Sequence, residues 1–108
     1  MHLYIISEMN IELDFEWDEA KRQKNIEKHK IDFLDAVKIF DNEEAIFTFQ
    51  DTRQDWGENR FVTIGLLNGI EIAVVHTPRK DKRRIISVRR ARTEERAKYY
   101  EEVLQNGD

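Results

Sequence analysis

Arginines gather in one short stretch of this chain. Residues 84–92 read RIISVRRAR, so four guanidinium groups fall within a few positions: those of Arg84, Arg89, Arg90 and Arg92. Arginine stays protonated near neutral pH and presents a planar fork of N–H donors that matches the oxygens of a phosphate or a carboxylate. The cluster therefore predicts a site for an anion. Salt bridges to the acidic part of the same chain are the alternative interpretation.

Charge is divided unevenly along the 108 residues. Residues 1–58 carry 15 acidic and 7 basic side chains, whereas residues 78–98 carry 10 basic and 3 acidic ones, within a net charge of -4. This asymmetry indicates a basic functional face on an acidic body. There is no apolar run long enough to span a membrane, and the start MHLYIIS lacks the features of a secretory signal. We therefore expect a cytoplasmic protein.

The composition does not indicate a metal site or a reactive thiol. The chain has no cysteine, which excludes disulfides and zinc sites built on thiolates. Its three histidines show no ligand spacing, and the pair Glu43-Glu44 is typical of a solvated turn. We expect no metal and no cofactor.

The N-terminal half predicts a strand and two helices that must position these groups. Residues 11–17, IELDFEW, alternate apolar and acidic side chains, which predicts a short strand or an extended lead-in. Asp18 is a suitable N-cap for a helix over residues 19–29. Asp32 caps a second helix, and its apolar residues fall on one face: Phe33, Ala36, Val37 and Phe40.

The C-terminal half predicts a sheet and a closing helix. Residues 45–50 form a β-rich run, and residues 60–67 and 70–77 flank Asn68-Gly69, a strong signal for a type I′ hairpin. A basic turn over residues 78–82 leads into a last strand over residues 83–91. Thr93 begins a closing helix whose buried stripe is predicted to be Ala97, Tyr100 and Leu104.

These elements predict a single α+β domain over residues 1–108. It has two N-terminal helices, an antiparallel sheet of about four strands and a C-terminal helix. The helices are expected to cover one face of the sheet and to leave the other face available.

Three blocks of the sequence share a pattern with one known family. Residues 15–40, FEWDEAKRQKNIEKHKIDFLDAVKIF, contain aromatic-Trp-Asp, a Lys three residues on, an Asn, Lys-His and a Phe-led second helix. Residues 57–65, GENRFVTIG, contain Glu-x-Arg-aromatic, and residues 85–101, IISVRRARTEERAKYYE, contain Ile-Ile-Ser-x-Arg-x-Ala before a Glu-Arg helix. Over residues 15–101 the chain resembles the BrnT family of toxins from bacterial type II toxin–antitoxin pairs.

The resemblance implies a RelE-like fold and metal-independent RNA cleavage that inhibits translation. It also implies a co-encoded antitoxin of the ribbon-helix-helix type (BrnA-like), whose complex with the toxin binds promoter DNA. Two features depart from the family pattern. Lys30 stands where a glycine usually follows Lys-His, so the first helix must end on a left-handed non-glycine residue or in another way. Residues 1–10 precede the family core, and Met9 is an alternative native start.

Metal-independent RNA cleavage makes the ribose 2′-OH the nucleophile on the neighbouring phosphate, and it needs a base, an acid and cations. Alternation along the last strand places Ile86 and Val88 toward the helices, and Ser87 and Arg89 on the open face. We therefore expect Arg89 to be the transition-state cation, with a structural salt bridge as the alternative. Arg90 is expected at the edge of the core.

Three further residues are catalytic candidates. Glu58 is a candidate base and Arg60 a candidate second cation, although an ion pair between them is an equal alternative. His76 has the intrinsic pKa for proton transfer near neutrality. However, His76 continues the apolar alternation of its strand, which favours a buried, hydrogen-bonded histidine.

A wider set of residues is predicted to bind RNA: Lys21, Arg79, Lys80, Lys82, Arg83, Arg90, Arg92 and Trp56. For Lys21 a solvated helix residue is the favoured interpretation, and ordinary loop solubility explains the turn cations equally well. Trp17 is expected in the core, and His29 at the end of a helix. The rival function is a non-catalytic antitoxin-binding or nucleic-acid-binding module that uses the same basic surface.

Overall fold

The computed structural model describes residues 14–106 of the chain. It contains a five-stranded sheet in the order β1-β5-β4-β3-β2. The strands are β1 (Phe15–Trp17), β2 (Phe47–Gln50), β3 (Phe61–Leu67), β4 (Ile70–Arg79) and β5 (Lys82–Arg90). The α-helices are α2 (Glu19–His29), α3 (Phe33–Ala36) and α4 (Thr93–Asn106), and two 3₁₀ turns follow α3, η1 (Val37–Asp41) and η2 (Glu43–Ala45).

The sheet is mixed, which corrects the prediction of about four antiparallel strands. Strands β2 to β5 pair antiparallel, but β1 adds a fifth strand that runs parallel to β5, with Trp17 opposite Ile85. The three residues of β1 belong to the stretch predicted as a strand or an extended lead-in. Its partner lies far away in the sequence, so no local pattern reveals this pairing.

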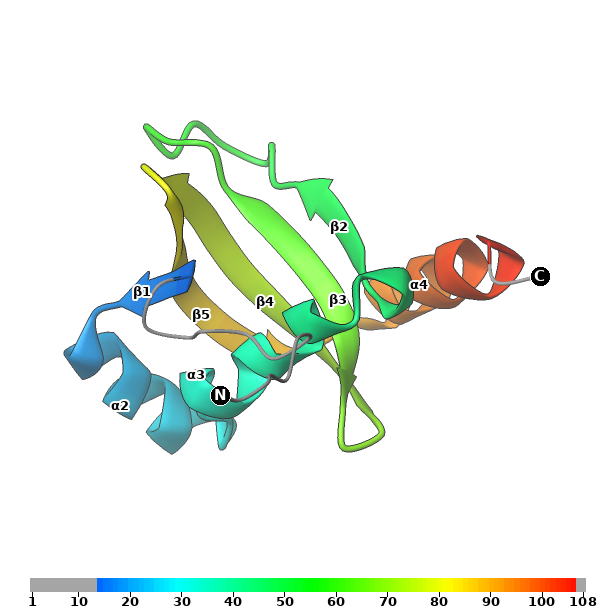
Figure 1. Cartoon of the computed structure of the whole chain (residues 1–108), viewed down its shortest axis with the longest axis horizontal. Coiled ribbons are helices and arrows are strands. Elements are labelled where there is room, and N and C mark those ends of the chain that lie inside the picture. Colours follow the sequence, from blue (N-terminus) through cyan, green and yellow to red (C-terminus); the bar gives the residue numbers. More distant parts are fainter. Residues whose placement is uncertain (1–13, 107–108) are drawn as a thin grey trace, which may run out of the picture.

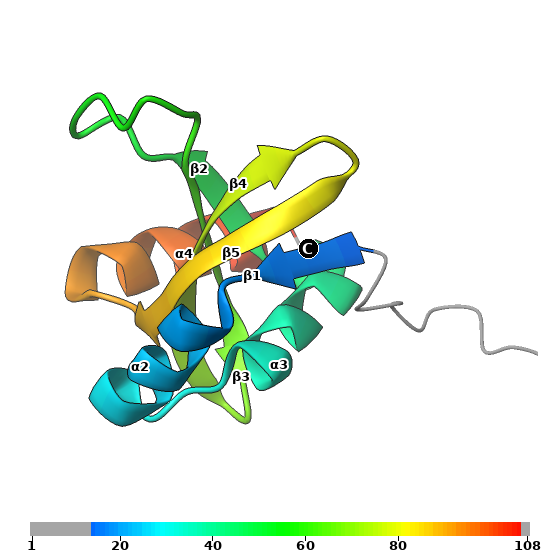
Figure 2. The same cartoon turned by 90° about the vertical axis from the view of Figure 1, so that its left-hand side faces the viewer.

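Both faces of the sheet are covered, so the expectation of one open face was wrong. The first face packs against α3 and η1 around Phe33, Val37 and Val74. The second face packs against α4 around Tyr99 and Ile64. Figure 2 shows α3 and α4 on opposite sides of the sheet.

Local signals placed the helix ends and the hairpin correctly. Asp18 and Asp32 accept hydrogen bonds from the first turns of α2 and α3, at 3.1 and 2.9 Å. Lys30 follows α2 in the left-handed region, with φ 63°, so a non-glycine does take the position that favours glycine. Asn68 and Gly69 both have positive φ and join β3 to β4.

Asn25 is the buried polar residue that joins α2 to the sheet. Its Oδ1 accepts from the backbone N–H of Val88 at 3.0 Å, and its Nδ2 donates to the carbonyl of Ile31 at 2.9 Å. Because β1 pairs with β5 only as far as Ile85, the amide of Val88 has no strand partner on that side. Asn25 therefore satisfies a donor that the short edge strand leaves open.

Strand β5 does not follow simple alternation. Val75 pairs with Ser87 but His76 pairs with Ile85, so Ile86 is the extra residue of a bulge. Ile85 and Val88 both enter the core of the first face, whereas Ile86 is only partly buried. The predicted place of Val88 is confirmed, and that of Ile86 was wrong because the bulge shifts the pattern by one residue.

The buried stripe of α4 also differs from the prediction. Tyr99 is buried and donates to the carbonyl of Ala45 at 2.9 Å, whereas Tyr100 and Leu104 are exposed. Glu95, one turn before Tyr99, is buried as well. Because the buried face of α4 includes a charged residue, a search for apolar residues at helical spacing does not identify it.

Candidate active site

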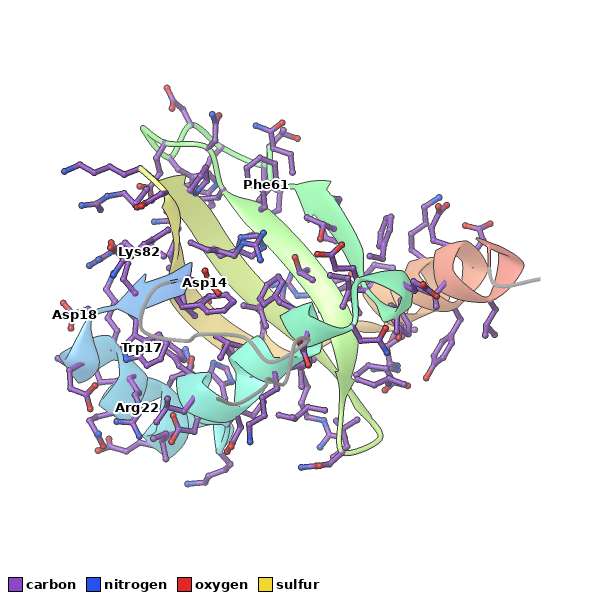
Figure 3. The ribbon with its side chains drawn as sticks, viewed as in Figure 1. Asp14, Trp17, Asp18, Arg22, Phe61 and Lys82 are labelled. Atoms are coloured by element: carbon purple, nitrogen blue, oxygen red, sulfur yellow. The ribbon has the colours of Figure 1, made fainter. Side chains whose placement is uncertain are left out.

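A cleft of about 590 Å³ opens on the first face, at the end of the sheet formed by the β4–β5 turn. This turn and the loop over residues 51–60 lie at the same end of the molecule in both ribbon views (Figures 1 and 2), opposite the Asn68-Gly69 turn. Figure 3 shows Asp14, Phe61 and Lys82, from three separate segments, around this end. The cleft is therefore assembled from residues that are far apart in the sequence.

Three of the cations predicted to bind RNA line this cleft: Lys80, Lys82 and Arg83. Lys80 occupies the β4–β5 turn with φ 57°. Lys82 and Arg83 follow it at the start of β5. The basic turn and the first residues of the last strand thus supply three cations to one hollow, which three carboxylates also line: Asp14, Glu43 and Asp81.

Arg83 is the most enclosed of these cations. Its guanidinium carbon lies 4.3 Å from the ring centre of Phe40 and 6.0 Å from that of Phe15, a cation–π arrangement. Within residues 14–106 it has no hydrogen bond and no ion pair. Burial lowers the pKa of Arg83, and the nearby carboxylates of Glu43 and Asp14 oppose that effect. Its donors are therefore available to an anion that enters the cleft.

His76 lies in the same cleft and is almost fully buried. Its ring meets Phe40 edge-on at 5.3 Å and stacks against Phe61 at 6.1 Å. Its Nε2 lies 2.8 Å from Oγ1 of Thr63. Burial, aided by the charge of Arg83, lowers the pKa of His76 to about 3, so the imidazole is neutral near neutral pH. The expected buried, hydrogen-bonded histidine is confirmed, and it is also part of a cleft.

Arg89 lies on the opposite face of the sheet. Its Nη1 and Nη2 donate to the two carboxylate oxygens of Glu95 at 2.7 and 2.9 Å. The pair is largely buried, with side-chain exposures of 17% and 9%. It borders a second groove of about 440 Å³, where Phe47 and Phe49 lie between β2 and α4. Arg89 thus forms a structural salt bridge, which was the alternative interpretation of this residue.

Glu58 and Arg60 form the ion pair that was the alternative to their catalytic roles. Arg60 Nε donates to Glu58 Oε2 at 3.1 Å, and the guanidinium lies 4.3 Å from the ring centre of Trp56. In the described part of the chain, Trp56 Nε1 is the only fully buried side-chain N or O atom without a hydrogen-bond partner. None of the three residues lines the cleft around His76.

The remaining candidates are dispersed over the surface. Lys21 is exposed on the first turn of α2, Arg79 is exposed at the end of β4, and Arg92 is exposed before α4. Arg90 is exposed beside His29, and has no ion pair within residues 14–106. Trp17 packs edge-on against Phe33 at 5.9 Å, as expected of a core residue (Figure 3).

Sequence reasoning missed Thr63, Phe61 and Phe40 as parts of the site. A signal for Phe61 was present, because the Asn68-Gly69 turn fixes the hairpin register and places Phe61 directly opposite His76. Thr63 follows from the same register, two residues along β3. No comparable signal exists for Phe40, which reaches the cleft from η1.

The described residues contain neither a metal-binding cluster nor a helix that could span a membrane. Between residues 14 and 106, no cluster of three or more His, Asp or Glu side chains has the arrangement of a metal site. None of the helices in that range is both long and apolar enough to cross a bilayer.

Comparison with known proteins supplies the family. The family described as "Ribonuclease toxin, BrnT, of type II toxin-antitoxin system" matches residues 17–95, which include α2, the whole hairpin and the start of α4. No curated protein matches the chain. The matched range contains every residue of the cleft named above except Phe15 and Asp14, which immediately precede it. The chain belongs to the BrnT family, the ribonuclease toxins of type II toxin–antitoxin systems.

Proposed function

We propose that this ribonuclease toxin cleaves RNA without a metal ion, in the cleft around Arg83 and His76. The observation that carries the proposal is the pairing of a neutral histidine with a half-buried arginine that forms no ion pair within residues 14–106, beside two lysines. Arg89 and Arg60 donate to their own carboxylates, whereas Arg83 retains all its donors. A phosphate is the natural ligand of such a cation.

The reaction follows from the chemistry of the RNA backbone. The ribose 2′-oxygen attacks the adjacent phosphorus, the bond to the 5′-oxygen breaks, and the products carry a 2′,3′-cyclic phosphate and a 5′-hydroxyl. His76 takes the proton of the 2′-OH, and the leaving 5′-oxygen receives a proton from solvent or from Lys80. A positioned base contributes roughly 10²–10⁴-fold to such a reaction when its pKa lies near the operating pH, and the lowered pKa of His76 places it at the lower end of that range.

Arg83 stabilises the negative charge that develops on the phosphorus. Its guanidinium is held against Phe40, so it is already oriented when the phosphate arrives. Preorganised donors of this kind contribute about 10²–10³-fold each. Lys80 and Lys82 hold the flanking phosphates at the rim, and the exposed Arg79 contributes less because it lies outside the cleft.

Membership of a toxin–antitoxin family implies an RNA substrate and an antitoxin partner. We propose that cleavage inhibits translation in the cytoplasm and that a co-encoded ribbon-helix-helix antitoxin neutralises the toxin by covering the cations of the cleft. Promoter DNA is then bound by the complex and not by the acidic toxin alone, because a net charge of -4 opposes binding to free nucleic acid.

The test is RNA cleavage by the purified protein in excess EDTA. Cleavage that yields cyclic phosphate ends, and that a 2′-O-methyl group at the scissile position abolishes, supports the proposal. Intact RNA in EDTA with cleavage restored by Mg²⁺ refutes metal independence. Intact RNA under both conditions, with RNA binding retained, favours the non-catalytic binding module.

A further inference from the structure

A chain of three hydrogen-bonded side chains runs from the edge of the sheet into the cleft. Thr48 on β2, Thr63 on β3 and His76 on β4 lie on the same face of three adjacent strands. Thr48 Oγ1 is 2.7 Å from Thr63 Oγ1, which in turn is 2.8 Å from His76 Nε2. Thr48 is exposed, whereas Thr63 is completely buried.

Burial leaves the Thr63 hydroxyl only these two side-chain partners within residues 14–106. A hydroxyl donates one hydrogen bond and accepts others. If Nε2 of His76 carries the proton, Thr63 accepts from it and donates to Thr48, whose own hydroxyl reaches solvent. If Nε2 is bare, the direction of both bonds is reversed. The direction in which the Thr63 hydroxyl donates its hydrogen bond therefore depends on the tautomer of His76.

The other ring nitrogen of His76, Nδ1, has no hydrogen-bond partner among residues 14–106. Among the described residues, Trp56 Nε1 is the only side-chain N or O atom that is both fully buried and without a hydrogen-bond partner. Nδ1 of His76 has no hydrogen bond to a described residue, so it must be at least partly exposed. One face of the ring stacks on Phe61, and the ring meets Phe40 edge-on. Nδ1 therefore remains accessible from the cleft that His76 lines.

The cations of the cleft select between the two tautomers. Arg83 lies near enough to affect the charge state of His76. A positive neighbour favours a lone pair over an N–H facing it. Because Nδ1 is the ring nitrogen on the side of the cleft that Arg83 also lines, this favours a lone pair on Nδ1 and the proton on Nε2.

We propose that Thr63 is the positioning residue of the ribonuclease site: it accepts from Nε2–H of His76, fixes that tautomer and aims the bare Nδ1 at the 2′-OH. The inference rests on the proposed function. When Nδ1 takes the proton, the imidazolium keeps its hydrogen bond to Thr63, so no bond has to reverse during the reaction. Thr63 holds the place that a carboxylate holds in a Ser-His-Asp triad, but without a charge.

The first test needs no RNA. Long-range ¹H–¹⁵N spectra of the labelled protein, with the His76 resonances identified by their loss in His76→Gln, report which ring nitrogen is protonated at neutral pH. The expected result is a protonated Nε2 and a bare Nδ1. A wild-type protein with the proton on Nδ1 overturns the inference and the base role of His76, whereas metal-independent RNA cleavage in the cleft is decided separately by the EDTA assay.

The second test measures RNA cleavage by Thr63→Val and Thr63→Ser. Valine keeps the shape but removes the hydroxyl, and the expected loss is about 10–100-fold in kcat with KM within about threefold, as for other groups that orient a catalytic histidine. Serine restores kcat to within about threefold. A Thr63→Val protein that folds and keeps wild-type kcat overturns the inference, whereas full activity in His76→Gln refutes the role of the histidine itself.

A variant of Thr48, the exposed end of the Thr48–Thr63–His76 hydrogen-bond series, provides a test if Thr63→Val does not fold. Thr48→Val removes the acceptor of the Thr63 hydroxyl on the surface, where folding is insensitive to the change. A fall in kcat of at least about threefold with unchanged thermal stability supports the chain of hydrogen bonds. An unchanged kcat overturns it.

Discussion

The pair between Arg89 and Glu95 gives the most demanding prediction about stability. The Glu95 carboxylate accepts three hydrogen bonds: from Nη1 and Nη2 of Arg89 at 2.7 and 2.9 Å, and from the backbone N–H of Arg92 at 2.8 Å. The last bond is half of a capping box, since it reaches back to the residue before α4. Glu95 therefore holds the start of α4 onto β5.

The substitution Glu95→Gln keeps the shape and removes the charge. It leaves the guanidinium of Arg89 largely buried without its counter-ion. Removing one partner of a buried pair costs roughly 3–5 kcal/mol, and the residual exposure of this pair reduces the expected loss to about 2–3 kcal/mol. For a domain of this size that is a fall of roughly 10 °C in Tm.

The assay is urea unfolding at neutral pH, with Glu94→Gln as the matched control. Glu94 is exposed and has no ion pair in the described residues, so its substitution is expected to change the free energy of unfolding by less than about 0.5 kcal/mol. Equal, small effects of both substitutions would refute the structural role of Arg89 and return it to the candidates for RNA binding.

The pH dependence of the same pair provides an internal check. Burial raises the pKa of Glu95, but the hydrogen bonds from Arg89 and from the Arg92 N–H outweigh it, so the folded-state pKa is below the ordinary value of 4.5. A lowered folded-state pKa gives stability that is present above the unfolded pKa and is lost as pH falls through the folded one. The advantage of wild type over Glu95→Gln should therefore shrink as pH falls below 4.5 and disappear once the pH is below the lowered folded-state pKa of Glu95.

Three further substitutions or conditions test other parts of the fold. Lys30→Gly should raise the free energy of unfolding by about 0.5–1 kcal/mol, because glycine adopts the left-handed φ of 63° without strain; a loss of stability contradicts this. Asn25→Ala should cost about 2–4 kcal/mol in urea unfolding, since it leaves the Val88 N–H and the Ile31 carbonyl unpaired; a cost below 1 kcal/mol contradicts it. Between pH 7 and pH 5 wild type should lose about 2 kcal/mol, because the pKa of His76 is lowered from 6.5 to about 3 and the unfolded chain takes up the proton; His76→Gln should lose less, and equal losses contradict the assignment.

Local rules account for the parts of the fold that the sequence predicted. Asp18 and Asp32 satisfy free amides one turn away, and Asn68-Gly69 adopts the positive φ that a tight hairpin requires. These signals depend on neighbours within a few residues, so they can be recognised in the sequence without knowledge of the tertiary structure. For the end of α2 the sequence left two possibilities open, and Lys30 takes the left-handed one, with φ 63°.

The features that escaped prediction depend on contacts between distant segments. The parallel pairing of β1 with β5 joins residues that lie far apart in the sequence. The bulge at Ile86 shifts the faces of β5 and cannot be inferred from alternation. The buried face of α4 includes Glu95, whose charge is hidden only because Arg89 neutralises it.

The choice between arginines was the hardest part of the site to predict. Arg83 and Arg89 are both arginines on β5, and their contacts in the folded protein distinguish them. Arg89 finds Glu95 after the chain has turned into α4, whereas Arg83 faces the rings of Phe40 and Phe15. The cluster of arginines at residues 84–92 thus marks the right strand, and Arg83, which forms no ion pair within residues 14–106, lies just before it.

The central claim is that Arg83 stabilises the transition state of RNA cleavage, and single-turnover cleavage rates in EDTA test it most directly. Arg83→Ala is compared with Arg79→Ala, which removes an exposed arginine from the same hairpin outside the cleft. The account predicts a loss of about 10²–10³-fold for Arg83→Ala and less than about threefold for Arg79→Ala, both in folded protein. Wild-type cleavage by Arg83→Ala would contradict the account.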